Sequence, residues 1–142
     1  MITQFSGEYR WLSNFWLVPV TLDGSDYPSV ENAYQAAKTK WHEMRKPFQT
    51  CSPGLAKRMG QDIVLSADWT QQKLKVMKEL IRQKFLDPKM AAKLLATGYT
   101  EIIEGNTWGD IFWGMCKGEG HNHLGLMIMQ MRHELRVLSS SK

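Results

Sequence analysis

The clearest periodic pattern of apolar positions predicts a helix between Trp69 and Phe85. Within this segment the apolar side chains that recur every three or four residues are Leu74, Met77, Ile81 and Phe85. This spacing places them on one helical face, and Asp87-Pro88 is a typical helix end. A second set at such spacing comprises Met127, Met131 and Leu135. It predicts a last helix from about His123 to Val137, with its methionines in the core rather than at a cofactor.

Weaker patterns fill the rest of the chain. Phe15 to Leu22 is rich in strand-forming residues and ends at Asp23-Gly24, so it predicts an edge strand, interrupted by Pro19, before a tight turn. The other predicted elements are a helix from Pro28 to about Lys38, short helices within Met44 to Gly60 broken at Ser52-Pro53-Gly54, a helix from Lys89 to Ala96, a strand from Thr100 to Glu104, and a glycine-rich loop from Gly105 to Gly120. The chain shows no repeat or linker. We therefore expect one α+β domain over residues 1–142, mostly helical with a small β-sheet.

Composition narrows the class of protein. With 43% hydrophobic and 23% charged residues in 142, the chain is unlike disordered, collagen-like or coiled-coil sequences. Two cysteines, Cys51 and Cys116, are too few for a disulfide scaffold or a four-cysteine zinc site. The chain start does not resemble a signal peptide, and the most apolar stretch is far shorter than a membrane span. We expect a soluble, cytoplasmic protein with reduced thiols and no membrane partner.

The net charge of +4 is unevenly distributed along the sequence. Residues 38–93 hold 13 basic and 5 acidic residues, a net charge of +8, whereas the rest holds 5 basic and 9 acidic residues, a net charge of −4. A positive middle beside an acidic remainder indicates a polyanionic ligand, such as phosphates or nucleic acid, meeting a carboxylate-bearing site. The alternative is that the lysines after Trp69 only form a solvated helix face.

One helix is predicted to carry a carboxylate and an amine together. Glu31, Gln35 and Lys38 stand at positions i, i+4 and i+7, so all three lie on one face. Such a pair can share a proton or activate water, or the lysine can attack an aldehyde. The alternative interpretation is a polar stripe in contact with solvent.

The glycine-rich loop is the second candidate for chemistry. Between Glu104 and Gly125 it interleaves six glycines with three aromatic rings and two carboxylates: Trp108, Phe112 and Trp113, with Glu104 and Asp110. Flat rings beside acids suit a planar heterocycle that is stacked and then acted upon. The alternative is a turn-rich loop held by buried tryptophans.

Metal and thiol chemistry receive less support. Cys116, His121 and His123 lack a matching second ligand pair, and neither cysteine has a supporting triad pattern. We therefore expect neither a metal nor another cofactor.

Several motifs in order resemble the YbiA-like family, also called the NADAR domain family. They are Leu12-Ser13-Asn14-Phe15, Tyr27-Pro28-Ser29-Val30-Glu31 with Gln35-Ala36-Ala37-Lys38, Ala56-Lys57-Arg58-Met59-Gly60, Trp69, Lys84-Phe85, Leu94-Leu95-Ala96-Thr97-Gly98, Trp108-Gly109-Asp110 with Trp113-Gly114, and Asn122-His123-Leu124-Gly125. They span nearly the whole chain. One departure is Asn32, where the family more often has histidine.

The resemblance implies an N-glycosidase. Its substrates would be phosphoribosylamino-pyrimidines of riboflavin synthesis, or ADP-ribosylated guanine as a small molecule or in nucleic acid. The alternative is a module that binds an ADP-ribose-like ligand without turnover. By position, the resemblance makes Glu31, Lys38 and Asp110 the predicted catalytic residues. The predicted substrate-binding residues are Trp69, Trp113, Asn14, Lys57, Arg58, Gln35, Trp108 and Asn122.

Two chemical routes remain open at this point. In one, Asp110 or Glu31 stabilises the positive charge that develops on the sugar as its C1–N bond breaks. In the other, suggested by the resemblance, Lys38 forms a Schiff base with the ring-opened sugar and so needs a lowered pKa. Trp69 and Trp113 would sandwich the base. Lys57 and Arg58, near an expected helix N-terminus after Pro53, would hold phosphate. All these side chains are expected around one pocket.

Overall fold

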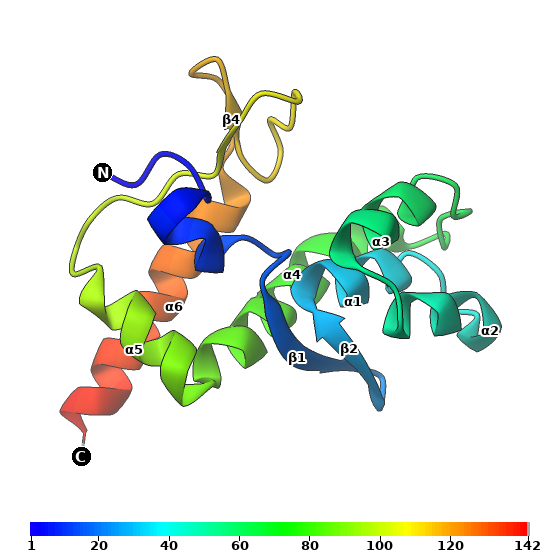
Figure 1. Ribbon diagram of the computed structural model, residues 1–142, viewed down its shortest axis with the longest axis horizontal. Coiled ribbons are helices and arrows are strands. Elements are labelled where there is room, and N and C mark those ends of the chain that lie inside the picture. The colour runs from blue at the N-terminus through cyan, green and yellow to red at the C-terminus, as the bar shows by residue number, and fades with distance from the viewer. Residues whose placement is uncertain (142) are drawn as a thin grey trace. The chain divides into compact units, whose positions relative to one another are not determined.

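A computed structural model describes residues 1–141 and divides the chain into two compact units. The hairpin unit is Asn14–Lys84, and the terminal unit is Met1–Ser13 together with the chain from Phe85 onward. Helices predominate and the described sheets have two strands each, which confirms the predicted α+β class (Figure 1). The prediction of one domain over residues 1–142 stays a prediction. Among the described residues, no helix is both long and apolar enough to cross a membrane.

The hairpin unit is built on an antiparallel pair of strands, β1 (Leu17–Leu22) and β2 (Ser25–Ser29). Asp23 and Gly24 form the turn with φ of 49° and 81°, which confirms the predicted turn. The register is irregular between Leu17 and Val20, at the proline that removes a ladder donor. Pro28 lies in β2, so its prediction as the first turn of a helix was wrong.

Four helices and a 3₁₀ turn complete this unit. They are α1 (Val30–Ala36), α2 (His42–Arg45), the 3₁₀ turn η2 (Lys46–Gln49), α3 (Pro53–Gly60) and α4 (Trp69–Leu86), whose last two residues belong to the terminal unit. Figure 1 shows α1 beside the hairpin, and α1 also contacts α3. The predicted break between short helices is found between Gln49, the end of η2, and Pro53, the first residue of α3, whose cap is the Ser52 hydroxyl.

Asn32 holds α1 against the segment that follows α2. Its Nδ2 donates to the carbonyls of Phe48 and Cys51, both at 2.9 Å, and the side chain is fully buried. These two bonds satisfy carbonyls that no regular element pairs. Asn32 therefore has a structural role in this unit.

The predicted bounds of α4 are confirmed, but the set of residues predicted for its buried face was partly wrong. Met77, Ile81 and Phe85 are buried as expected, but Leu74 is 38% exposed. Lys84 lies in the buried stripe and is fully buried. The whole side chain of Lys84, its amine included, is therefore removed from water.

Burial lowers the pKa of Lys84 to about 7, because desolvation penalises the charged amine. The unfolded chain then binds a proton that the folded chain lacks between about pH 7 and pH 10, so stability rises with pH in that window. For the wild type relative to Lys84→Met, the free energy of unfolding should rise by about 1.4 kcal/mol per pH unit there. Urea titrations of both chains at several pH values measure this difference, and parallel curves would contradict it.

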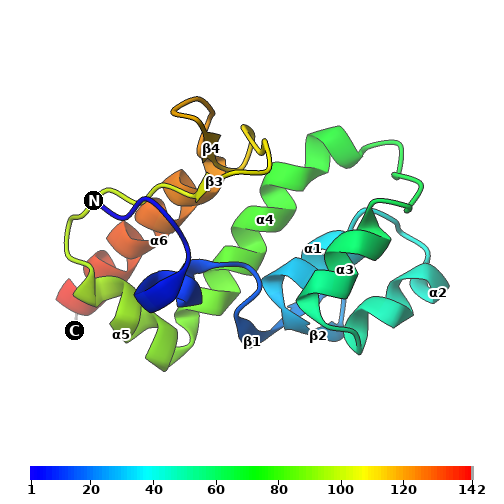
Figure 2. The ribbon, with the colours of Figure 1, turned by 45° about the horizontal axis from the view of Figure 1, so that its top comes forward.

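The terminal unit contains the 3₁₀ turn η1 (Gly7–Leu12), α5 (Pro88–Ala96), β3 (Gly105–Asn106), β4 (Met115–Cys116) and α6 (His123–Ser140). Figure 2 shows β3 beside β4, which pair in parallel, and α5 next to α6. The expected strand from Thr100 to Glu104 is wrong. Ile102 makes only an isolated bridge to Ile2 there. Ile2 and Ile102 are both buried, and their burial stabilises this bridge.

Candidate active site

Glu31 lies in the first turn of α1 and is only 8% exposed. The helix begins there because the Ser29 hydroxyl accepts a bond from the Asn32 amide, and the Glu31 amide donates to the Asn14 carbonyl at 3.0 Å. Gln35 Nε2 donates to Glu31 Oε1 at 3.2 Å. A carboxylate held in the interior by a designated donor is not part of a solvated stripe, so that alternative is wrong.

Lys38 follows α1 and is partly buried. Its Nζ donates to the Gly60 carbonyl at 3.5 Å and lies 6.0 Å from the centre of the Tyr34 ring. Desolvation lowers the pKa of Lys38, nearby Lys73 lowers it further, and Glu31 opposes both. The net lowering makes the neutral amine more accessible than in an ordinary lysine, and a neutral amine is the form that attacks carbonyl carbon.

The predicted ring Trp69 packs within the hairpin unit. Its ring lies 5.3 Å from that of Tyr34 at an interplanar angle of 56°, and only 6% of the residue is exposed. Tyr34, whose face Lys38 approaches, was not predicted as a site residue. The i, i+4 spacing of Tyr34 and Lys38 places them on one side of the chain and could have identified this ring.

Asn14 supports Glu31 through its backbone rather than its side chain. Its carbonyl receives the Glu31 amide, while its Nδ2 points to the sulfur of Met77 at 3.6 Å. The side-chain Oδ1 of Asn14 is buried and has no hydrogen-bond donor among the described residues. Its predicted role in substrate binding stays a prediction.

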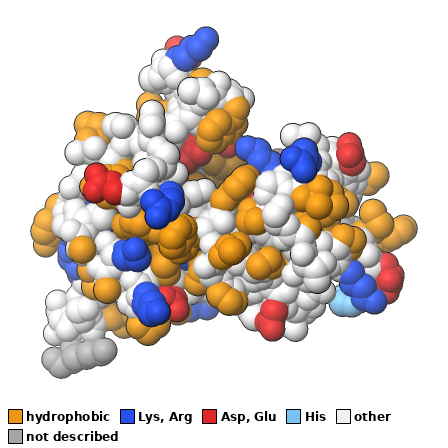
Figure 3. Space-filling model, in the orientation of Figure 1, with side chains coloured by type: hydrophobic (Ala, Val, Ile, Leu, Met, Phe, Trp, Pro, Cys, Tyr) orange, Lys and Arg blue, Asp and Glu red, His pale blue; other side chains and the backbone are white. Residues whose placement is uncertain are grey.

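The expected placement of Lys57 and Arg58 at a helix N-terminus was wrong. Both lie in the last turn of α3, where exposed carbonyls rather than amides face outward. Lys57 Nζ lies 5.9 Å from the ring centre of Phe15 and Arg58 is exposed. Their proposed contact with phosphate must therefore come from the side-chain charges alone. Over α2 and α3, apolar side chains also reach the surface (Figure 3).

In the terminal unit, Asp110 organises the glycine-rich loop. Its Oδ1 accepts from the amides of Phe112 at 3.1 Å and Trp113 at 2.9 Å, as in a turn closed by an aspartate. Asn106 clasps the same residue, since Asn106 Oδ1 accepts from the Asp110 amide and Asn106 Nδ2 donates to its carbonyl. One carboxylate oxygen of Asp110 is thus occupied by the turn.

Glu104 and Asn106 are polar loop residues whose pairing the sequence did not reveal. Asn106 Nδ2 also donates to Glu104 Oε2 at 2.9 Å. Gly114 lies directly against this carboxylate, since a Cβ there would come within 1.7 Å of Glu104 Oε2. The glycine at this position therefore serves close approach to the carboxylate rather than loop flexibility.

The other predicted loop residues differ in exposure. Trp113 stands edge-on to Phe112 at 4.8 Å between ring centres, whereas Trp108 is 61% exposed. Asn122 is buried and ties the start of α6 to the segment 102–104, accepting from the Glu104 amide and donating to the Ile102 carbonyl. Its contacts in this structure are structural.

The imidazoles of His121 and His123 stack with ring centres 5.4 Å apart. Across residues 1–141, no group of three or more His, Cys, Asp and Glu side chains is arranged to hold a metal ion.

The structure thus brings Glu31, Gln35 and Lys38 together in the hairpin unit, with Tyr34 linking Lys38 to Trp69. It places the predicted residues Asp110, Trp113, Trp108 and Asn122 in the terminal unit. The expectation of one pocket that contains all of them stays a prediction.

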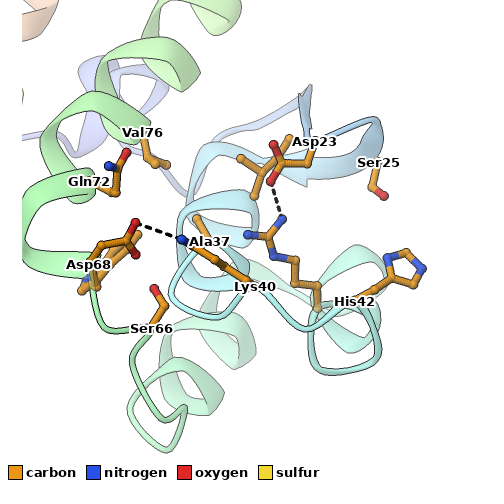
Figure 4. A pocket seen from close by; sticks show the side chains of 12 residues that line it. Asp23, Ser25, Ala37, Lys40, His42, Ser66, Asp68, Gln72 and Val76 are labelled. Carbon is orange, nitrogen blue, oxygen red and sulfur yellow. Dashed lines mark hydrogen bonds and ion pairs between the residues drawn. The ribbon is translucent and has the colours of Figure 1, made fainter.

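A cavity of about 630 Å³ opens in the hairpin unit on the side of Trp69 and Ala37 (Figure 4). Two ion pairs line it: Lys40 with Asp68 at 2.9 Å, and Arg45 with Asp23 at 2.6 Å. Each cation is matched by a carboxylate, so the lining has little net charge. We interpret these pairs as structural ties around the cavity.

Loss of the cation from each of these two ion pairs should affect the free energy of unfolding differently. Arg45 is largely buried, and its Nε also donates to the carbonyl of Thr39 at 2.6 Å. Arg45→Ala should therefore cost about 1–3 kcal/mol, because it leaves a buried acceptor unpaired. Lys40→Ala, at an exposed pair, should leave stability nearly unchanged. Urea unfolding of both variants measures the contrast, and equal losses would contradict it.

A sequence profile of the NADAR domain matches residues 3–136. The N-glycosidase YbiA of Escherichia coli (strain K12) is 34% identical over 137 residues, which cover 93% of this chain and 85% of that protein. A riboflavin biosynthesis protein of Vibrio vulnificus is 34% identical over 133 residues, which cover 90% of this chain and 36% of that protein. An NMR structure of the E. coli protein YbiA matches with a TM-score of 0.86 and 32% identity, covering 99% of this chain and 86% of that chain.

Proposed function

The chain belongs to the NADAR domain family, and from this premise we propose that it is an N-glycosidase. It would hydrolyse the bond between C1 of a ribose and a nitrogen of a planar base. The observation that carries the proposal is the combination of a buried carboxylate, Glu31, positioned by Gln35, with the partly buried amine of Lys38, whose pKa is lowered. In the Schiff-base route the amine attacks C1 and the carboxylate transfers protons.

For the substrate, we propose a phosphoribosylamino-pyrimidine or an ADP-ribosylated guanine. A relative named as a riboflavin biosynthesis protein supports the first of these. The basic residues of the hairpin unit support a phosphorylated substrate of either kind. A location in the cytoplasm, where Cys51 and Cys116 would remain reduced, belongs to the same proposal.

In this scheme, opening of the ribose ring is followed by two chemical steps. Ring opening of the ribose turns C1 into an imine carbon bonded to the base nitrogen. The neutral Lys38 amine adds to C1, both of its protons pass to the base nitrogen, and the base leaves as a primary amine, so that a Schiff base joins Lys38 to the sugar. Water then adds to C1, the C1–Nζ bond breaks, and the sugar leaves as its aldehyde. Glu31 carries protons in both steps, because its carboxylate lies close enough to Lys38 to act on the charge of that amine.

The remaining predicted residues would bind substrate. Trp69 and Trp113 would sandwich the base, and Trp108 would make a further contact with the substrate. Lys57 and Arg58 would neutralise phosphate, and Asn14 and Asn122 would shape the backbone around the sugar. Asp110 uses its second carboxylate oxygen, the one not bonded to the turn, to face developing positive charge.

The test is to incubate the purified chain with both substrate types and analyse the products by mass spectrometry. Release of a free base together with the matching ribose phosphate or ADP-ribose is the expected result. Unchanged substrate that nevertheless binds tightly would instead identify a module that sequesters an ADP-ribose-like ligand.

A further inference from the structure

The side-chain amide of Gln35 is almost completely buried in α1, with 5% of the residue exposed. Its Nε2 donates to Glu31 Oε1 at 3.2 Å. Because an ionised carboxylate only accepts hydrogen bonds, this contact sets the orientation of the amide. Nε2 must face Glu31, and Oε1 must face the opposite way.

The opposite side of the amide rests on Gly60, the last residue of α3. A Cβ on Gly60 would lie 1.8 Å from Gln35 Oε1 and 2.6 Å from its Cδ, so a side chain there would displace the amide. Oε1 itself has no donor among residues 1–141. A buried amide oxygen without a donor is unfavourable, which points to a partner that arrives at another stage of the reaction.

The side-chain amine of Lys38 reaches the same glycine. Its Nζ donates to the Gly60 carbonyl at 3.5 Å, which is a long hydrogen bond. The amine of Lys38 and the unpartnered oxygen of Gln35 therefore both lie against one residue of α3. The Gly60 carbonyl and Gln35 Oε1 are thus two acceptors near one another at this glycine.

We propose that Gln35 is a positioning residue, which holds the Glu31 carboxylate through Nε2 and offers Oε1 as the acceptor for the Lys38 amine when that amine is protonated. This rests on the proposed N-glycosidase function. The neutral Gln35 amide donates a hydrogen bond to the Glu31 carboxylate, so that no charged lysine is needed as the donor. A direct Glu31–Lys38 ion pair would stabilise the ammonium form, whereas the amide leaves the lysine free to lose its proton. Gln35 need not touch the substrate.

Positioning predicts an effect on kcat with little effect on KM. Gln35→Met keeps the size of the side chain and removes both hydrogen-bonding groups, so kcat should fall about 10-fold or more while KM stays within about twofold. Gln35→Glu places a second carboxylate beside Glu31 and Lys38, and kcat should fall further. Gln71→Glu, an exposed change of the same kind on α4, is the matched control and should leave both constants unchanged.

Gly60→Ala tests the slot on the other side of the amide. It should lower kcat in the wild-type chain and have a much smaller effect in the Gln35→Met background, where the clashing amide is absent. Thermal unfolding of each variant separates this coupling from a loss of folded protein. If Gly60→Ala fails to fold, Gln35→Met alone still decides the matter.

The outcomes are distinct. An active wild type whose Gln35→Met variant keeps kcat overturns the inference and leaves the proposed function in place. A raised KM with an unchanged kcat overturns it as well, because Gln35 would then bind substrate directly. A wild type that cleaves none of the substrates overturns the proposed function and this inference with it.

Discussion

Lys38→Arg and Lys38→Ala should each lower kcat by about 10³-fold or more. Arginine keeps the positive charge but has no amine that can lose a proton near neutral pH, so it cannot form a Schiff base. Rate measurements under saturating substrate determine the loss. Because the pKa of Lys38 is lowered, the wild-type rate should also rise with pH below the range where an ordinary lysine loses its proton.

Lys75→Arg and Lys75→Ala on the exposed face of α4 are the matched controls and should keep full activity. Substantial activity in Lys38→Arg would contradict the lysine route. It would favour a route in which carboxylates alone stabilise the sugar cation. Asp110→Asn would then be the more damaging change, since it removes a charge that faces the cation.

Glu31→Gln should lower kcat by about 10²–10⁴-fold, the range typical of a lost general acid or base. The substitution keeps the shape of the side chain, and its amide oxygen can still accept from Gln35 Nε2, so the fold should be retained. Initial rates and a thermal unfolding curve for the same preparation check both statements.

Glu79→Gln is a suitable control, because Glu79 is an exposed carboxylate of α4 paired with Arg82. It should not change the rate. A fully active Glu31→Gln enzyme would show that this carboxylate carries no proton in the reaction, and the proposed mechanism would be wrong.

Long periodic patterns predicted the helices well, because burial of an apolar face determines where they lie. The bounds of α4 and the start of α6 match their patterns closely. The strand β2 was missed because Ser25-Asp-Tyr-Pro-Ser29 has few strand-forming residues and is held by pairing with β1. Such a strand exists through its partner, which a local pattern does not reveal.

Local patterns likewise predicted only part of the candidate site. Helical spacing alone indicated that Glu31, Gln35 and Lys38 share a side of the chain. It did not reveal that Gln35 is clamped between Glu31 and Gly60, because that contact joins α1 to α3 across 25 residues of sequence. Pro53 correctly indicated where α3 begins, but the sequence did not reveal how short this helix is. Lys57 and Arg58 therefore fall in its last turn and not near its N-terminus.

The most direct test of the central claim is to quench the wild-type reaction with borohydride during turnover and map the modified peptide by mass spectrometry. The Schiff-base route predicts that free base is released and that a reduced sugar adduct is found on Lys38, and on no lysine of the Lys38→Arg variant. Release of base at the normal rate without any adduct, or an adduct on another lysine, would contradict it.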